Sequence, residues 1–298
     1  GKTINPLTSL ASKEVYAIPL ILMIGWRGVP GEKDEPQHKM MGRIMLSQLK
    51  TLEIPYRILP DNILEAEEVI RNAKKQAEKT EYASAIIIKN RILEKYVSQK
   101  ISKTNYELLR EDAIKIIIEN LDGDEAVIST TGKTSRELFE QRISKGEIPR
   151  DFYTVGSMGC SASIALGIAL KKPAKKIFVF DGDGSVLMQM GALSTIGSCK
   201  LKNFVHIIFD NASYDSTGGQ PTNSGNVNFE LIAKACGYNN VKTTETKKDL
   251  ISSINQIKSL DGPSMIVIKI NKGARKNLGR ITSTPIENKR AFMEFLGK

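Results

Sequence analysis

The chain has 298 residues and a formal net charge of +10 at pH 7. Hydrophobic residues make up 41% and charged residues 26%, which fits a globular protein of about two domains and excludes disordered, collagen-like and coiled-coil chains. The longest apolar run, residues 18–24, is much shorter than the roughly 20 residues of a membrane span. Three widely spaced cysteines match neither a metal motif nor a disulfide framework, so we expect a cytoplasmic protein without a membrane partner.

The positive charge has two interpretations, nucleic acid or a small polyanionic ligand. The basic residues are scattered in pairs such as Lys74-Lys75 and Lys247-Lys248, and aromatic residues are only 6% of the chain. No basic surface with stacking aromatic side chains is therefore predicted. We expect no nucleic-acid partner and a small anionic ligand instead.

Short apolar runs alternate with helical patterns along the whole chain. Strands are predicted at residues 18–24, 56–59, 85–89, 126–129, 151–155, 177–180, 204–209, 240–243 and 265–270. Helices are predicted at residues 38–49, 63–79, 106–120, 135–143, 161–170, 192–200, 229–236 and 247–258. Apolar strands that are bounded by Gly, Asp and Asn and separated by helices indicate parallel strands buried in an α/β fold.

A polar stretch at residues 95–104 predicts a domain boundary near residue 100. We expect two doubly wound parallel-sheet domains, residues 1–100 and residues 101–298. The second contains a complete set of strands, whereas the first is short for such a sheet. Because the sequence also begins at Gly1 in a polar run, we expect the first domain to be truncated at its N-terminus.

The motif with the clearest chemistry is Gly182-Asp183-Gly184-Ser185, which directly follows a predicted strand. Asn211 ends the next strand, at about the 30-residue spacing of a βαβ unit. A right-handed crossover places both strand ends at one edge of the sheet, so Asp183 and Asn211 should converge. One charged and one neutral oxygen ligand, beside glycines that admit a large anion, suit Mg²⁺ shared with phosphate oxygens. Taken alone, Gly-Asp-Gly can also be a plain turn.

Two other turns are candidates for anion binding. Gly156-Ser157-Met158-Gly159 joins a predicted strand to a helix; the alternative is a tight turn with Met158 in the core. Thr131 lies between another strand and helix, where its hydroxyl can bind a phosphate or cap the helix. Both interpretations of each turn are open at this point.

A loop dense in Gly, Pro and charged residues follows the first predicted strand, at residues 26–38. Such a loop at the carboxyl end of a strand is typical of binding sites. Arg27 can hold a carboxylate or phosphonate, and His38 can donate a proton, although a helix-start cap is the simpler interpretation of a single His. His206 lies within an apolar strand and is interpreted as structural.

The pair Asp183 and Asn211 resembles the cofactor signature of thiamine-diphosphate-dependent enzymes, in which these residues hold Mg²⁺ on the diphosphate. The resemblance implies that the Ser213 carbonyl is the third metal ligand. It also implies that Met158 wedges under the cofactor and brings its aminopyrimidine nitrogen to the thiazolium C2 proton. The cofactor-binding residues implied in this way are Thr131, Gly156, Ser157, Met158, Gly159, Gly182, Asp183, Gly184, Ser185, Asn211, Ser213 and Tyr214.

Four longer stretches narrow this resemblance to the phosphonopyruvate decarboxylase family, with the sulfopyruvate decarboxylases as near relatives. They are residues 5–10, residues 25–38, Asp215-Ser216-Thr217-Gly218-Gly219-Gln220-Pro221-Thr222, and residues 272–276. The resemblance covers essentially the whole chain. The chain departs from the family pattern at Tyr214, where a His is common, and at Cys160-Ser161, where His and Ala are expected.

The resemblance implies a carboxy-lyase that converts 3-phosphonopyruvate, a small anionic 2-oxo acid, to phosphonoacetaldehyde and CO₂ in phosphonate biosynthesis. It implies a homo-oligomer with active sites between subunits and Arg27 and His38 near the substrate. Basic residues of the segment 269–276 can close over the phosphonate, and the alternative for this segment is a solvated basic tail. The family's catalytic glutamate lies upstream of residues 5–10. Since no residue here can be assigned to it, we expect this 298-residue chain to turn over poorly.

Three alternatives remain open from the sequence. One is decarboxylation of sulfopyruvate. A second is a carboligating enzyme of the acetolactate synthase type, against which the lack of a middle domain and of a flavin-binding segment argues. A third is a non-catalytic fragment that holds the Mg²⁺-bound cofactor without turnover.

Overall fold

The computed structural model describes residues 3–94, 96 and 104–297 of the chain. The chain divides into two compact units, Gly1–Lys100 and Ile101–Lys298. Each is an α/β unit built on a parallel sheet. No helix in the described part of the chain is both long and apolar enough to cross a membrane.

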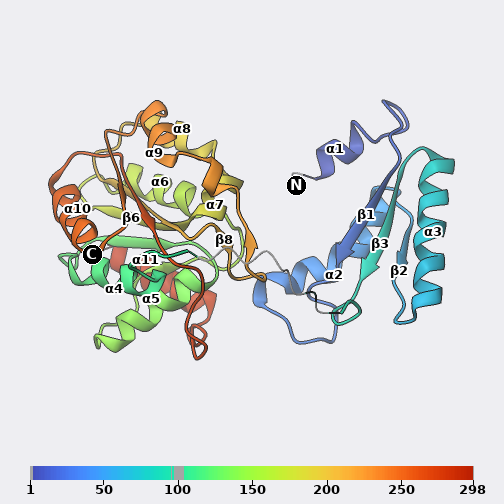
Figure 1. The fold of residues 1–298 in the computed structure, drawn as a ribbon, viewed down its shortest axis with the longest axis horizontal. Coiled ribbons are helices and arrows are strands. Elements are labelled where there is room, and N and C mark those ends of the chain that lie inside the picture. The colour runs from blue at the N-terminus through green and yellow to red at the C-terminus, as the bar shows by residue number, and fades with distance from the viewer. Residues whose placement is uncertain (1–2, 95, 97–103, 298) are drawn as a thin grey trace. The chain divides into compact units, whose positions relative to one another are not determined.

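The first unit contains a three-stranded parallel sheet in the order β1-β3-β2 (Figure 1). Its elements are α1 (Ile4–Thr8), β1 (Leu20–Gly25), α2 (Pro36–Thr51), β2 (Tyr56–Ile58), α3 (Ile63–Thr80) and β3 (Ala83–Ile88). β3 is central and buried, and it packs one face against α1 and α2 and the other against α3. Asn62 caps α3 by accepting the N–H groups of Leu64 and Glu65, which fixes where the helix begins.

The second unit contains a six-stranded parallel sheet in the order β10-β11-β7-β6-β4-β5 (Figure 1). Its strands are β4 (Ala126–Ser129), β5 (Phe152–Tyr153), β6 (Ile177–Gly182), β7 (Phe204–Asp210), β10 (Asn240–Thr244) and β11 (Ser264–Lys269), with a small antiparallel pair, β8 (Ser213–Tyr214) and β9 (Gln220–Pro221). The helices are α4 (Arg110–Glu119), α5 (Lys133–Ser144), α6 (Ser161–Lys171), α7 (Asp183–Met188), α8 (Ala192–Ser198), the 3₁₀ turn η1 (Ser224–Asn226), α9 (Phe229–Ala235), α10 (Lys247–Ser259) and α11 (Pro285–Gly297).

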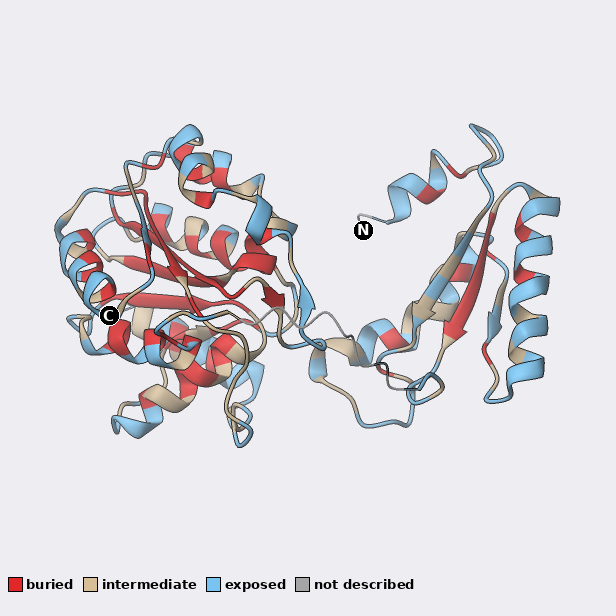
Figure 2. Cartoon of the chain, in the orientation of Figure 1, coloured by how far each residue is buried: buried red, intermediate tan, exposed pale blue. Residues whose placement is uncertain are grey.

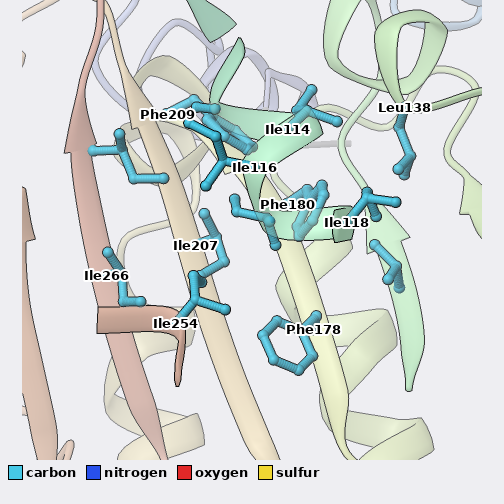
Figure 3. Close-up of a cluster of buried hydrophobic side chains, with 14 of the residues drawn as sticks. Ile114, Ile116, Ile118, Leu138, Phe178, Phe180, Ile207, Phe209, Ile254 and Ile266 are labelled. Carbon is cyan, nitrogen blue, oxygen red and sulfur yellow. The ribbon is translucent and has the colours of Figure 1, made fainter. Parts of the chain in front are cut away.

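Helices cover both faces of this sheet, and side chains alternate between the two cores. Phe178 and Phe180 of β6 face a core shared with α4, α5 and α10, whereas Ile177 and Val179 face the helices α6, α8 and α9. The inner strands β4, β6, β7 and β11 are buried along nearly their whole length, as Figure 2 shows. Figure 3 shows the first core, where Phe180 meets Phe209 of β7 edge to face at 5.5 Å between ring centroids. This double burial explains the near-continuous apolar strands of the sequence.

Two predicted elements were wrong in extent, and the helix α11 was not predicted. The helix predicted at 106–120 begins only at Arg110, because Asn271 binds both backbone groups of Tyr106 and holds residues before the helix in an extended conformation. The strand predicted at 151–155 is limited to β5. α11, which the predicted elements leave out, packs Phe292 into the core beside Phe152.

The direction of winding reverses within the second sheet. From β4 the chain passes to β5 on one side and then to β6 on the other, so the direction of winding reverses between β4 and β6. In open α/β sheets, ligands bind at the carboxyl ends of the strands at such a reversal. The fold therefore places a binding site beyond the ends of β4 and β6.

Candidate active site

Three turns meet at the carboxyl edge of the second sheet, and hydrogen bonds join them. The Thr131 hydroxyl accepts the Gly156 N–H at 3.1 Å, which links the turn after β4 to the turn after β5. The Gly159 N–H donates to Ser185 Oγ at 3.0 Å, and Ser185 Oγ lies 3.1 Å from Thr130 Oγ1. All three turns that the sequence singled out are thus brought together.

The alternative interpretations of two of these turns do not hold. Thr131 does not cap the following helix, whose N-cap residue is Gly132 without a side-chain cap, because its hydroxyl is bound to Gly156. Met158 is half-buried and belongs to none of the apolar cores. Gly156 and Ser157 have φ values of 73° and 45°, so this turn holds two successive residues in the left-handed region. The turn therefore presents Met158 near the edge of the sheet rather than in its core.

Asp183 and Asn211 follow the neighbouring strands β6 and β7, as the βαβ spacing predicted. They are 2% and 3% exposed. Asn211 Oδ1 accepts the Ser213 N–H at 3.0 Å, and the Asp183 carboxylate accepts the Thr222 hydroxyl. The edge of the sheet thus presents a buried carboxylate and a buried amide from adjacent strand ends.

The electrostatics at Asp183 favour a cation. Burial, with the nearby carboxylate of Asp210 as a lesser cause, raises the pKa of Asp183 to about 6. A cation bound to Asp183 would offset both effects. Among the described residues no three His, Cys, Asp or Glu side chains gather as a metal site, so oxygens of Asn211 and of the backbone would have to complete the ligand set.

The residues present fit a metal-bound diphosphate. Ser213 Oγ is buried without a hydrogen-bond partner, and a Cβ added at Gly182 would meet no atom within 4 Å. An orphaned hydroxyl in one turn and open space at the glycine of another leave a polar ligand room to approach the backbone. Asp183, Asn211 and the Ser213 carbonyl are donors of the kind that Mg²⁺ prefers.

Tyr214 packs directly over Gly184. A Cβ built on Gly184 would lie 2.3 Å from Tyr214 Cε1, so only glycine fits beneath the ring. We expect Gly184→Ala to lower the free energy of unfolding by about 1–3 kcal/mol through overpacking, as measured by chemical denaturation. The matched control is Gly182→Ala, where the added methyl group meets nothing and the loss should be smaller.

The double variant Gly184→Ala with Tyr214→Ala decides the cause of that loss. Removing the ring should cancel the steric part of the Gly184→Ala effect. Equal losses from Gly184→Ala in the two backgrounds would show that the contact with Tyr214 is not responsible.

Several polar residues that hold this edge together escaped the sequence analysis. Asp210 accepts Ser224 Oγ at 2.7 Å and the Lys269 ammonium at 2.5 Å. Thr222 binds both Asp183 and Ser224, so a continuous chain of polar contacts runs from Lys269 to Asp183. The only feature of the sequence that pointed to this chain of polar contacts was the position of Asp210 directly before Asn211.

The basic segment 269–276 is not a solvated tail, because carboxylates neutralise two of its charges. Lys269 is paired with Asp210. Arg275 is paired with Glu111, at 2.8 Å, and with Glu140. The role of this segment over a phosphonate stays a prediction.

His206 is buried between Asp181 and Tyr238, at 3.4 Å from each, which agrees with its structural interpretation.

In the first unit, Asp34 organises the loop that contains Arg27 and His38. Its two carboxylate oxygens accept Arg27 Nε and Nη2 at 3.0 and 2.6 Å and the N–H groups of Gly28 and Glu35. His38 Nδ1 lies 2.9 Å from Asp34 Oδ1. These contacts, led by the Arg27 fork, hold the pKa of Asp34 well below its usual range. Because a carboxylate only accepts, the proton of His38 is on Nδ1, and its Nε2 is the nitrogen available to a ligand.

The comparisons with known proteins agree with this geometry. Residues 131–268 match the family model "Thiamine pyrophosphate enzyme, C-terminal TPP binding domain". The phosphonopyruvate decarboxylase of Streptomyces viridochromogenes is 34% identical over 99% of this chain and 77% of its own length, and that of Streptomyces hygroscopicus is 36% identical over 99% and 76%. The chain belongs to the phosphonopyruvate decarboxylase family.

Relatives of this family include the sulfopyruvate decarboxylases. The beta subunit of sulfopyruvate decarboxylase from Methanocaldococcus jannaschii is 39% identical over 62% of this chain and 95% of its own length. The family model identifies thiamine diphosphate as the cofactor, and its range includes every cofactor-binding residue predicted in the second unit, from Thr131 to Tyr214. These comparisons confirm the fold class and the family that the sequence motifs indicated.

Proposed function

We propose that this protein decarboxylates 3-phosphonopyruvate to phosphonoacetaldehyde and CO₂, with thiamine diphosphate and Mg²⁺. The observation that carries the proposal is that buried Asp183 and Asn211 follow the adjacent strands β6 and β7, next to the winding reversal between β4 and β6, within the range of the thiamine-pyrophosphate-binding family model. In the reaction the bond between the carboxylate carbon and the keto carbon breaks, CO₂ leaves, and one proton is taken up to give the aldehyde. Thiamine diphosphate supplies the nucleophilic carbon and the electron sink that this cleavage needs.

Asp183, Asn211 Oδ1 and the Ser213 carbonyl would hold Mg²⁺, which in turn holds the diphosphate. The carboxylate contributes charge, and the two neutral oxygens complete a set that leaves positions for phosphate oxygens. The turns at Thr131, Gly156–Gly159 and Gly182–Ser185 would bind the cofactor, and Met158 would be the apolar side chain that supports it. In this assignment residues 101–298 are the diphosphate- and Mg²⁺-binding domain and residues 1–100 the pyrimidine-binding domain.

Arg27 and His38 are the residues that we assign to the substrate. Asp34 fixes the guanidinium of Arg27 and orients His38 so that Nε2 can give or take a proton. A phosphonate and a carboxylate on one small molecule match a site that includes the exposed guanidinium of Arg27, whose Nε and Nη2 are bound to Asp34 and whose Nη1 is not. We further infer a homo-oligomer with active sites between subunits.

An assay with two substrates distinguishes the proposed function from a second candidate, the decarboxylation of sulfopyruvate. The beta subunits of sulfopyruvate decarboxylases match at 38–39% identity over nearly their whole length, so sulfopyruvate is the alternative substrate. Purified protein with thiamine diphosphate and Mg²⁺ should release CO₂ and phosphonoacetaldehyde with a higher kcat/KM for phosphonopyruvate than for sulfopyruvate, and the turnover of residues 1–298 alone should be low. A preference for sulfopyruvate would reassign the substrate, and cofactor binding without turnover of either acid would identify a non-catalytic binding module.

Arg27→Ala should lower kcat/KM for phosphonopyruvate, because losing one ion pair in a binding site costs about 2–5 kcal/mol. The matched control is Arg71→Ala, which removes an exposed arginine that is paired with Glu67 on α3 of the same unit. Steady-state kinetics on both variants measure the difference. Unchanged kcat and KM for Arg27→Ala would remove Arg27 from substrate recognition and leave it a partner of Asp34 only.

A further inference from the structure

Asp215 lies in the turn between β8 and β9 and accepts three hydrogen bonds on a single oxygen. Its Oδ2 accepts Asn211 Nδ2 at 2.8 Å, the Gly273 N–H at 3.0 Å and Arg110 Nη1 at 3.4 Å. The side chain is only 8% exposed. A carboxylate held from three directions in a buried position has little freedom to move.

Arg110 fixes this carboxylate from outside the loop. The guanidinium is buried, and its Nε and Nη2 bind the two oxygens of Glu137 at 2.7 and 3.0 Å. Nη2 also reaches the Gly273 carbonyl at 3.4 Å. Arg110 begins α4, and Glu137 lies on α5, so two helices of the scaffold support the position of Asp215.

The contact with Asp215, together with the Ser213 N–H, determines which end of the Asn211 amide faces the candidate metal position. A carboxylate only accepts hydrogen bonds, so Asn211 must turn its Nδ2 toward Asp215. Its Oδ1 then lies on the other side, where it accepts the Ser213 N–H and keeps a second lone pair for a cation. With the amide reversed, an NH₂ group would face the cation and could not bind it.

We infer that Asp215, held by Arg110 and by the Gly273 N–H, is a positioning residue that orients Asn211 as a metal ligand. The inference rests on the proposed function, which makes Asn211 a ligand of Mg²⁺. It explains why a buried carboxylate occurs within hydrogen-bond distance of an asparagine at the end of β7. Partners of this kind, one step removed from the metal, hold ligands in the orientation that binding requires.

Mn²⁺ binding measured by electron paramagnetic resonance, with thiamine diphosphate in excess, tests the inference without reference to turnover. Asp215→Ala should weaken Mn²⁺ binding by about 10- to 100-fold, the usual loss for a residue that orients a metal ligand. If Asp215→Ala does not fold, Asp215→Asn provides the same test, because its amide can no longer fix the direction of Asn211. Circular dichroism checks that each variant is folded.

Asp151→Asn is the matched control. Asp151 is also a buried, arginine-paired aspartate, bound to Arg142 at 2.8 and 2.9 Å, but it lies before β5, away from the carboxyl edge of the sheet. Neutralising it should lower stability and leave the Mn²⁺ affinity of the folded protein within about twofold of the parent.

The double variant with Asn211→Ala separates positioning from general support. If Asp215 acts through Asn211, then Asp215→Ala should cause no further loss of Mn²⁺ affinity once Asn211 is removed. A full additional loss in that background, or an unchanged affinity in Asp215→Ala alone, would overturn the inference. If Asn211→Ala itself leaves Mn²⁺ binding unchanged, the metal site of the proposed function fails instead.

Discussion

Replacing Asp183 with Asn should weaken thiamine diphosphate binding in the presence of Mg²⁺ by at least about a hundredfold. Loss of a partner one step away from a metal already costs up to about a hundredfold, and Asp183 is the charged ligand itself. The substitution keeps the shape of the side chain and its place beside Thr222. Isothermal titration calorimetry of the cofactor, with Mg²⁺ and with a chelator, measures the loss.

Asp181→Asn is the control for this experiment. Asp181 lies on the same strand, is 1% exposed, and contacts Gly182 N–H and His206. Both substitutions therefore remove a buried negative charge, but only Asp183 is a proposed ligand. An equal loss of affinity in the two variants, or no loss in Asp183→Asn, would contradict the assignment.

Phe180→Ala should lower the free energy of unfolding of the second unit by about 3–5 kcal/mol, as expected for a fully buried aromatic ring. Phe180 is completely buried at the end of β6 and meets Phe209 edge to face. Deleting the ring leaves a cavity directly behind the strand that ends in Gly182-Asp183. Amide hydrogen exchange of β6 and β7, followed by mass spectrometry, measures the change.

Phe295→Ala serves as its control, because that ring is only partly buried at the surface, beneath Arg150 and Lys175. Phe295→Ala should reduce the hydrogen-exchange protection of β6 and β7 by less than half of the reduction that Phe180→Ala causes. A change below about 1 kcal/mol for Phe180→Ala would mean that the ring is not part of the packing that supports the site.

Local pattern was enough to predict the strands β4, β6, β7, β10 and β11 of the second unit to within two residues at each end, although not the extent of β5. The apolar runs at β6 and β7 are buried on both faces, so their composition marks them as strands. The crossover rule then places Asp183 and Asn211 at one edge without further information. Turns made of glycines and hydroxyl residues are short-range features, and all three were found where the sequence placed them.

Contacts between distant residues could not be predicted in this way. Arg110 and Asp215 are far apart in the sequence, and nothing in either segment specifies the other. The same is true of Asn271, which delays the start of α4 through Tyr106. Three acidic residues of the loop, Glu32, Asp34 and Glu35, are near enough in the sequence to pair with Arg27. Only the structure shows that Asp34 is the partner.

One missed element did have a local signal. Thr284 and Glu287 form a capping box, since Glu287 Oε2 accepts the Thr284 N–H at 2.8 Å and Thr284 Oγ1 accepts the Glu287 N–H at 3.3 Å. Pro285 occupies the first position of the helix, which is typical of a helix start. The pattern Thr-Pro-Ile-Glu therefore predicts α11 from the sequence alone.

The central claim is that Asp183, Asn211 and the Ser213 carbonyl hold the metal that binds the cofactor diphosphate. Anomalous diffraction from crystals grown with Mn²⁺ and thiamine diphosphate tests it most directly. We expect a single strong manganese peak within about 2.0–2.4 Å of one Asp183 carboxylate oxygen, Asn211 Oδ1 and the Ser213 carbonyl oxygen. A manganese peak elsewhere, with thiamine diphosphate bound and these three oxygens without metal, would contradict the account.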